Sequence, residues 1–283
     1  MRTTLAGCDS AALAAAFNAV YAEYVMPFTM SPAQAQRHVH STSIDLTRSP
    51  LWLDEAGAVQ AMAALSIRDR HGWIGGFGVA PASRGRRLGH ALLQAVIDSA
   101  TACGLHQLEL EALVTNPAAI HLYERGGFEC AGDDLLGLHG GPDLPAQDLP
   151  AMEPRTVDLE QALAALALFR SAAPCWQREA ATLRALPDLR CVLLGEASRP
   201  LAVVIYRQIE ANIILADSAA RDPEAALALL NWLAQAWPGR HMHLSNEPER
   251  SAVCQAAMRA GWTEIWRQHR MIRALAEQGT SAG

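Results

Sequence analysis

The sequence predicts an α/β protein with a mixed sheet, built in two halves. Between Trp73 and Phe128 it reads as a strand, an arginine-glycine loop, a helix, a second strand and a second helix. Residues 139–150 are too rich in proline, glycine and aspartate for a regular element and predict a linker. A similar order of elements recurs after this linker. At 283 residues the chain is near the size at which one core gives way to two, so we expect domains at 1–145 and 151–283.

The first strand of this unit ends in a glycine-rich segment. Residues 72–78 contain four glycines, and glycine weakens an ordinary strand because it has no side chain to pack. The segment therefore predicts a bulge or the close approach of a ligand rather than continuous strand pairing.

The loop after this strand contains arginines, and a helix begins within it. Leu88, Leu92 and Val96 recur four residues apart, which is the spacing of one helical face. The start of a helix leaves backbone N–H groups unpaired and carries positive partial charge, so it can bind an anion. Gly85 and Gly89 keep side chains away from the backbone, and three guanidinium groups add charge: Arg84, Arg86 and Arg87. The loop predicts a phosphate ligand; a solvated, arginine-rich turn is the alternative.

The second strand and helix follow with equally local signals. Residues 106–114 alternate between apolar and polar, with Glu109 and Glu111 on one face, as in a half-exposed strand. Asn116 then caps a helix whose first residue is proline, and Gly126-Gly127 ends that helix. Tyr123 lies about two turns beyond the cap.

Together these segments resemble the GCN5-related N-acetyltransferase (GNAT) family. In that family the loop reads Gln or Arg, two residues, Gly, one residue, Gly or Ala, and its amides hold the pyrophosphate of coenzyme A. Arg84 and Gly89 match this pattern, whereas Arg87 stands where the middle glycine is usual. The family pattern of the second helix is met at six positions: Asn116, Ala119, Leu122, Tyr123, Gly127 and Phe128.

The resemblance implies that the chain transfers an acetyl group from acetyl-CoA to a primary amine. The family also separates two parallel strands at the end of the strand before the loop, so that main-chain groups can bind pantetheine. The cofactor-binding residues that it implies are Phe77, Gly78, Val79, Arg84, Gly85, Arg86, Arg87, Leu88, Gly89, His90, Asn116, Ala119 and Tyr123. Phe77 could instead belong to the core.

The resemblance also suggests the catalytic groups. Tyr123 matches the tyrosine that protonates the leaving sulfur, and an ordinary tyrosine pKa of about 10 keeps it protonated at neutral pH. Glu111 stands where the ribosomal-protein N-terminal acetyltransferases of the family carry a base. Glu109 could serve instead, or could raise the pKa of Glu111 by repulsion. The alternatives are a core tyrosine and a pair of surface carboxylates.

The second half shows a weaker repeat of the first. We expect helices at 158–169, 176–186, 225–237 and 251–260, and strands at 190–195, 201–206, 212–216, 242–245 and 263–271. Residues 246–262 echo 116–128, which suggests an internal duplication. However, the loop at 218–224 has no glycine and carries two acids, and Ala257 stands where Tyr123 does. We therefore expect a GNAT-like domain that has lost coenzyme A binding; an unrelated α+β domain is the alternative.

Composition excludes several other functions. The chain carries 29 acidic and 23 basic residues, and this acidic balance argues against nucleic-acid binding. The basic residues are all arginine, which excludes Schiff-base and Walker-loop chemistry because both need lysine. Six scattered cysteines without a Cys-x-x-Cys pair predict neither zinc nor a disulfide framework, so we expect a reduced, cytoplasmic protein. We expect no signal sequence and no membrane span.

Metal binding and the acceptor are the remaining questions. The pairs His38–His40 and His241–His243 could each share a strand face, but neither has a third ligand nearby, so we expect no metal. In the family the first helices shape the acceptor side, which is residues 17–28 here. Tyr21, Glu23 and Tyr24 could contact a small polar amine, or the tyrosines could be core. The identity of the amine and the choice between monomer and homodimer stay open, as do two other functions, an acyl-CoA sensor and an interaction module.

Overall fold

The computed structural model describes residues 1–26, 28–142, 153–170, 172–196 and 198–275. The chain forms two compact units, Met1–Gly132 with the segment that begins at His269, and Asp133–Gln268. The units divide at Gly132 and Gln268 rather than between residues 145 and 151, because β13 (Thr263–Ala274) contributes residues to both. The expected linker begins too early, since His139 and Gly140 belong to β7 (Leu135–Gly140). Residues 143–150 lie outside the described part of the chain.

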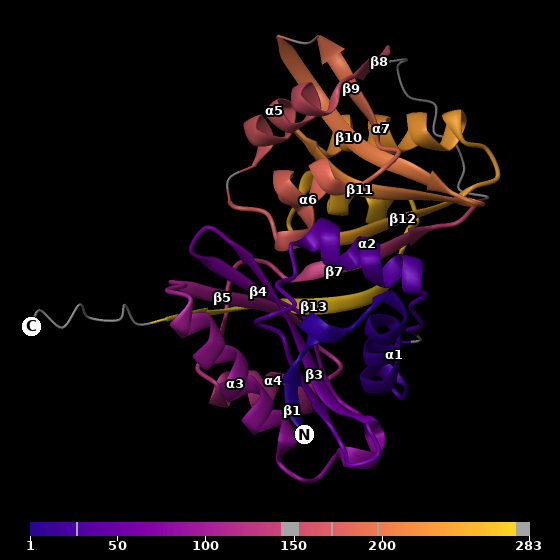
Figure 1. The fold of residues 1–283 in the computed structure, drawn as a ribbon. Helices are drawn as coiled ribbons and strands as arrows, with labels where there is room; N and C mark the ends of the chain where they lie inside the picture. The colour runs from indigo at the N-terminus through magenta and orange to yellow at the C-terminus, as the bar shows by residue number, and fades with distance from the viewer. Residues whose placement is uncertain (27, 143–152, 171, 197, 276–283) are drawn as a thin grey trace, which may run out of the picture. The chain divides into compact units, whose positions relative to one another are not determined.

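The first unit is a mixed sheet with helices on both faces. Its elements are β1 (Arg2–Thr4), η1 (Leu5–Gly7), α1 (Ser10–Tyr21), α2 (Pro32–Thr42), β2 (Pro50–Leu53), β3 (Val59–Arg68), β4 (His71–Val79), η2 (Pro81–Ser83), α3 (Leu88–Ala102), β5 (Gln107–Leu113), α4 (Pro117–Arg125) and β6 (Glu129–Cys130), with the end of β13 (Figure 1). The strand order is β1-β2-β3-β4-β5-β13, and β6 pairs with β13. β4 and β5 are parallel, whereas β1, β2, β3 and β4 pair antiparallel in sequence order. The mixed sheet predicted from the sequence is therefore confirmed.

Strand β3 shows why helices cover both faces. Successive side chains of a strand point to opposite faces. Met62 and Ala64 pack against α1 and α2, whereas Ala61, Ala63 and Leu65 pack against α3 and α4. All five side chains are fully buried. The sheet of the first unit is thus the middle layer of three.

The second unit repeats this order of elements. It contains β7, β8 (Pro154–Val157), α5 (Leu159–Phe169), η3 (Trp176–Arg178), α6 (Ala180–Ala185), β9 (Arg190–Glu196), β10 (Arg199–Ile209), β11 (Asn212–Ala220), α7 (Pro223–Ala236), β12 (His241–Pro248), α8 (Ala252–Arg259) and the start of β13. Its strand order is β13-β7-β12-β11-β10-β9-β8, and β11 and β12 are its parallel pair. α7 and α8 pack on one face of this sheet, and α5 and α6 pack on the other. The single helix expected at 176–186 is η3 followed by α6.

The ends of α4 and α8 have the same geometry. Gly127 and Gly261 both have positive φ, +77° and +84°, as the left-handed residue after a helix does. The N–H of Phe128 donates to Tyr123 O at 3.0 Å, and the N–H of Trp262 donates to Ala257 O at 3.0 Å. Ala257 is therefore the geometric counterpart of Tyr123.

The starts of these two helices do not match as expected. Ser251 caps α8, and its hydroxyl accepts from the Cys254 N–H at 2.9 Å. Asn246, which we expected to correspond to Asn116, instead lies within β12. The sequence echo therefore holds for the ends of the helices and fails at their starts.

Candidate functional site

The parallel strands β4 and β5 part before either one ends. Their ladder covers three pairs, from His71 and Gln107 to Trp73 and Glu109, although the strands continue to Val79 and Leu113. On the β3 side the register shifts, which leaves Gly75 as an extra residue in β4. The expected bulge is therefore present, and the later residues of β4 turn one main-chain edge away from β5. Phe77, Gly78 and Val79 lie in this separated segment.

A tyrosine hydroxyl occupies part of the separation. The N–H of Phe77 donates to Tyr21 Oη at 3.2 Å, and Tyr21 is the last residue of α1. Burial raises the pKa of Tyr21. Its ring lies 5.0 Å from that of Tyr24 and 4.8 Å from that of Phe28, centroid to centroid. The tyrosines considered for the acceptor side therefore pack together beside β4.

The loop before α3 exposes its cations and leaves the helix start uncapped. Arg84, Gly85, Arg86 and Arg87 are exposed, and Leu88, Gly89 and His90 form the first turn of α3. No side chain of the described residues caps this helix. The helix start therefore has no side-chain cap from the described residues, and three exposed arginines directly precede it, a combination that suits an anion.

The backbone of this loop explains the family's glycine pattern. Arg87 adopts a left-handed conformation, with φ +59°, at the position where the middle glycine is usual. A side chain at such a φ is strained and glycine is not. Gly85 also has positive φ, +78°, and a Cβ built on it meets no atom within 4 Å. Glycine at position 85 thus avoids backbone strain rather than a steric clash, whereas a Cβ on Gly89 would approach Leu122 to 3.4 Å.

Arg84 connects this loop to the segment that follows α1. Its Nη1 lies 3.0 Å from Glu23 Oε2, and its Nε donates to Val79 O at 3.4 Å. The two paired side chains are 47% and 66% exposed, so solvent screens the ion pair and an anion can compete for Arg84.

Helix α4 brings Tyr123 to the separated strands. The Asn116 side chain caps this helix by accepting from the Ala119 N–H at 3.2 Å. Tyr123 is 7% exposed, and its ring centroid lies 5.7 Å from that of Phe77. Burial raises the pKa of Tyr123, with smaller contributions from Tyr21 and Tyr24. Its hydroxyl therefore carries its proton at neutral pH.

The two carboxylates of β5 have different environments. Glu109 is 4% exposed and pairs with Arg270, whose Nη2 lies 2.6 Å from its Oε2. Glu111 is half-buried and accepts from Trp73 Nε1 at 2.8 Å. The alternative of two surface carboxylates is wrong, because β13 brings a guanidinium from 161 residues away onto Glu109.

Sequence reasoning missed His38 as a neighbour of this region. Its ring centroid lies 6.3 Å from that of Trp73, the residue that holds Glu111. Burial lowers the pKa of His38, although a hydrogen bond with the Gly75 backbone opposes the shift. The pairing of His38 with His40 on a strand face was wrong, since both lie in α2. The capping residue Ser31 and the following Pro32 indicate a helix at residues 32–42, and this pattern could have placed His38 on a helix.

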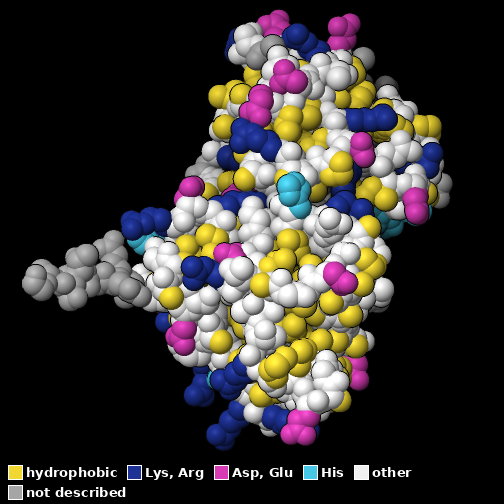
Figure 2. Space-filling model, viewed as in Figure 1, with side chains coloured by type: hydrophobic (Ala, Val, Ile, Leu, Met, Phe, Trp, Pro, Cys, Tyr) yellow, Lys and Arg dark blue, Asp and Glu magenta, His cyan; other side chains and the backbone are white. Residues whose placement is uncertain are grey.

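The second histidine pair does lie on a strand. The rings of His241 and His243 in β12 both stack on His139, with centroids 5.2 and 4.9 Å away. In the described part of the chain, no three histidine, cysteine or acidic side chains are arranged to hold a metal ion. Nor does any described helix have the length and hydropathy needed to cross a bilayer. Figure 2 shows acidic and basic side chains interspersed over the face that it draws.

Comparisons with known proteins agree with the expected fold. Residues 14–128 match the model of the acetyltransferase (GNAT) family. A GCN5-related N-acetyltransferase from Sphaerobacter thermophilus is 18% identical, with a TM-score of 0.71 over 97% of this chain and 95% of that one. A putative acetyltransferase from Pyrococcus horikoshii is 12% identical, with a TM-score of 0.69 over 98% and 90%.

A tandem GNAT protein from the clavulanic acid biosynthesis pathway is also similar. It is 15% identical, with a TM-score of 0.65 over 97% of this chain and 98% of that chain. A search of the curated proteins finds no match. The chain therefore has a GNAT fold with a mixed sheet, and the family match falls within its first unit.

Proposed function

We propose, from the family match of residues 14–128 and the site that these residues build, that the protein is an acetyl-CoA-dependent N-acetyltransferase. One observation carries the proposal: a break in the pairing of two parallel strands lies beside an uncapped helix start that arginines surround. The first feature suits a neutral, amide-bearing chain and the second suits a pyrophosphate. Coenzyme A joins these two chemical groups in one molecule.

The residues of the first unit fit such a donor. First-turn amides of α3 and the arginines of the loop would bind the pyrophosphate. The edge of β4 that turns away from β5 would hydrogen-bond the pantetheine amides, in place of the Tyr21 hydroxyl at Phe77. The donor site would consist of Phe77, Gly78, Val79, Arg84, Gly85, Arg86, Arg87, Leu88, Gly89 and His90, with Asn116, Ala119 and Tyr123 from α4.

The chemistry needs an acid and a base. The acceptor nitrogen attacks the thioester carbonyl and loses a proton, while the departing sulfur gains one. Tyr123 is protonated at neutral pH and lies beside Phe77 of the separated strand, so we assign it as the general acid. Glu111 accepts from an indole N–H and is assigned as the base. Glu109 is the weaker candidate because Arg270 already neutralises it.

We further propose that the second unit is a GNAT-like domain without a donor site. Asp222 caps α7, and its carboxylate accepts from the Ala225 N–H at 2.8 Å. An acid thus stands at the helix start where the first unit would bind phosphate. Ala257 occupies the position of Tyr123, so the unit also lacks an acid for the sulfur. A chain with this organisation binds one donor molecule.

A calorimetric titration with acetyl-CoA and the variant Tyr123→Phe test the proposal. We expect one site per chain, and Tyr123→Phe should retain donor affinity while turnover of an amine panel falls about a hundredfold or more. Tyr206→Phe removes a buried tyrosine hydroxyl from the second unit and is the matched control, with unchanged turnover. An absence of donor binding, or full activity in Tyr123→Phe, would refute the assignment.

A further inference from the structure

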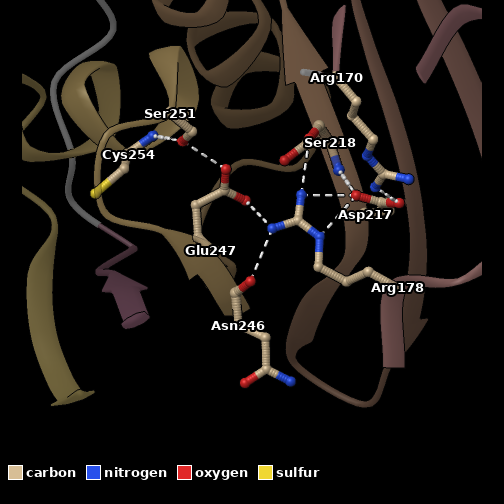
Figure 3. A network of polar contacts seen from close by, with 8 residues as sticks. All are labelled: Arg170, Arg178, Asp217, Ser218, Asn246, Glu247, Ser251 and Cys254. Carbon is tan, nitrogen blue, oxygen red and sulfur yellow. Dashed lines mark hydrogen bonds and ion pairs between the residues drawn. The ribbon is translucent and has the colours of Figure 1, made fainter. Parts of the chain in front are cut away.

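The parallel strands of the second unit also part, and a guanidinium lies between them. The ladder of β11 and β12 covers four pairs, from Asn212 and His241 to Leu215 and Leu244. Both strands continue, β11 to Ala220 and β12 to Pro248. This is the same arrangement as in β4 and β5. Figure 3 shows the side chain of Arg178, from η3, placed between the two strand ends.

Arg178 donates hydrogen bonds to groups of both strands. On the main chain, Nη2 donates to Ser218 O and Nη1 donates to Asn246 O, each at 2.9 Å. Nε and Nη2 lie 2.8 and 2.7 Å from Asp217 Oδ1. Nη1 also donates to Glu247 Oε2 at 2.8 Å. A guanidinium carries its donors in a fixed plane, and each of the three Arg178 nitrogens donates to an acceptor of the two strands.

The acceptors form a buried, charge-balanced cluster. The side chains of Arg178, Asp217 and Glu247 are 6%, 0% and 1% exposed. Arg170 contacts Asp217 from the other side, so two cations face two carboxylates. Burial raises the pKa of Glu247, whereas Arg178 and a hydrogen bond from the Ser251 hydroxyl lower it.

We propose that the separation of β11 and β12 is a guanidinium-binding site that the chain fills with its own Arg178. Two main-chain carbonyls and two carboxylates specify a planar cation, and a neutral pantetheine offers no charge to replace it. The second unit therefore keeps the strand geometry of a donor cleft but is closed by an internal ligand. The comparison with a donor cleft rests on the proposed function, whereas the guanidinium site rests on the contacts of Arg178 alone.

The test is chemical rescue of Arg178→Ala with methylguanidine. Removing one partner of a buried ion pair leaves its carboxylates uncompensated, so the unfolding equilibrium constant should rise about a hundredfold or more. Methylguanidine at millimolar concentration should restore much of the lost thermal stability. Methylammonium chloride at the same concentration is the control for charge and ionic strength. Arg184→Ala, which breaks an exposed pair with Glu160, should change neither stability nor the response.

Three outcomes are decisive. A gain in melting temperature with methylguanidine that exceeds the gain with methylammonium supports the site, and equal gains overturn it. If Arg178→Ala does not fold alone, the same two compounds are compared by its refolding yield from urea. Wild-type stability in Arg178→Ala would also overturn the proposal. Because none of these readouts involves acetyl-CoA, a failure to bind the donor would refute the proposed function and leave this result intact.

Discussion

The left-handed backbone at Arg87 gives a prediction that separates conformation from charge. Arg87 has φ +59°, whereas Arg86 is not among the residues with positive φ. Both side chains are exposed and both carry one positive charge. Arg87→Gly and Arg86→Gly therefore remove the same charge from the same loop, but only the first relieves backbone strain.

The expected difference follows from two opposing contributions. A residue with a Cβ costs roughly 1–2 kcal/mol in the left-handed region. Glycine loses more backbone entropy on folding, which destabilises by roughly 0.5–1 kcal/mol. Arg87→Gly should therefore raise the free energy of unfolding by about 0.5–1 kcal/mol, whereas Arg86→Gly should lower it by a similar amount. The two variants should differ by about 1–2 kcal/mol.

Urea unfolding followed by circular dichroism measures this difference, and melting temperatures give a second measure. An increase of 1 kcal/mol corresponds to about 2–4 °C for a domain of this size class. Calorimetry of both variants with coenzyme A should show similar weakening, since each loses one cation near the proposed pyrophosphate. Equal stability changes in the two variants would refute the conformational argument.

Two further predictions concern the phosphate loop and the histidine stack. Arg84→Glu should weaken coenzyme A binding more than tenfold, about 1.4 kcal/mol. Glu23→Gln should strengthen the binding, because it releases Arg84 from its ion pair. Calorimetry that finds the affinity changed in the same direction by both variants contradicts the assignment. Burial and the neighbouring His139 and His241 lower the pKa of His243 below 6.5 in the folded state. The contribution of neutral His243 to stability is therefore complete above pH 6.5 and is lost as the pH falls through the folded-state pKa. In His243→Asn the free energy of unfolding, measured by urea titration, should therefore fall less between neutral and acid pH than in the wild type. The same pH dependence in both proteins rules this out.

Local signals made much of the first unit predictable. The Asn116 cap, the proline after it and the glycines at the end of α4 act within a few residues, so their pattern specifies a helix without reference to the rest of the chain. The glycines of β4 likewise indicated a bulge, which lies at Gly75. The start of α3 within the loop followed in the same way from the spacing of Leu88, Leu92 and Val96.

Long-range partners could not be read from the sequence. Glu109 looked half-exposed because its strand alternates, yet it is buried against Arg270 from the last strand. The sequence placed Arg178 in a predicted helix, but the partners of its side chain come from two strands further along the chain. The alternation of a strand shows which residues share a face, but it does not show what covers that face. The division of the chain at Gln268 was missed for the same reason, because β13 serves both units.

The two pairs of parting strands raise one energetic question. Main-chain groups turned away from a partner strand must be satisfied, since a buried unpaired group costs about 1–3 kcal/mol. In the first unit the Phe77 N–H donates to the neutral Tyr21 hydroxyl, and such a bond contributes only about 0.5–1.5 kcal/mol net. Under the proposed function, a pantetheine carbonyl would therefore replace Tyr21 with little loss.

In the second unit two main-chain carbonyls of the parted strands, Ser218 O and Asn246 O, accept from a charged side chain. Arg178 satisfies two carbonyls and two carboxylates at once, and removing one partner of such a buried pair costs about 3–5 kcal/mol. A neutral ligand that entered here would have to supply that free energy and also leave Asp217 and Glu247 without their cation. The group between the strands is thus neutral in one unit and charged in the other. Under the proposed function, this difference in charge would decide which unit can admit a donor.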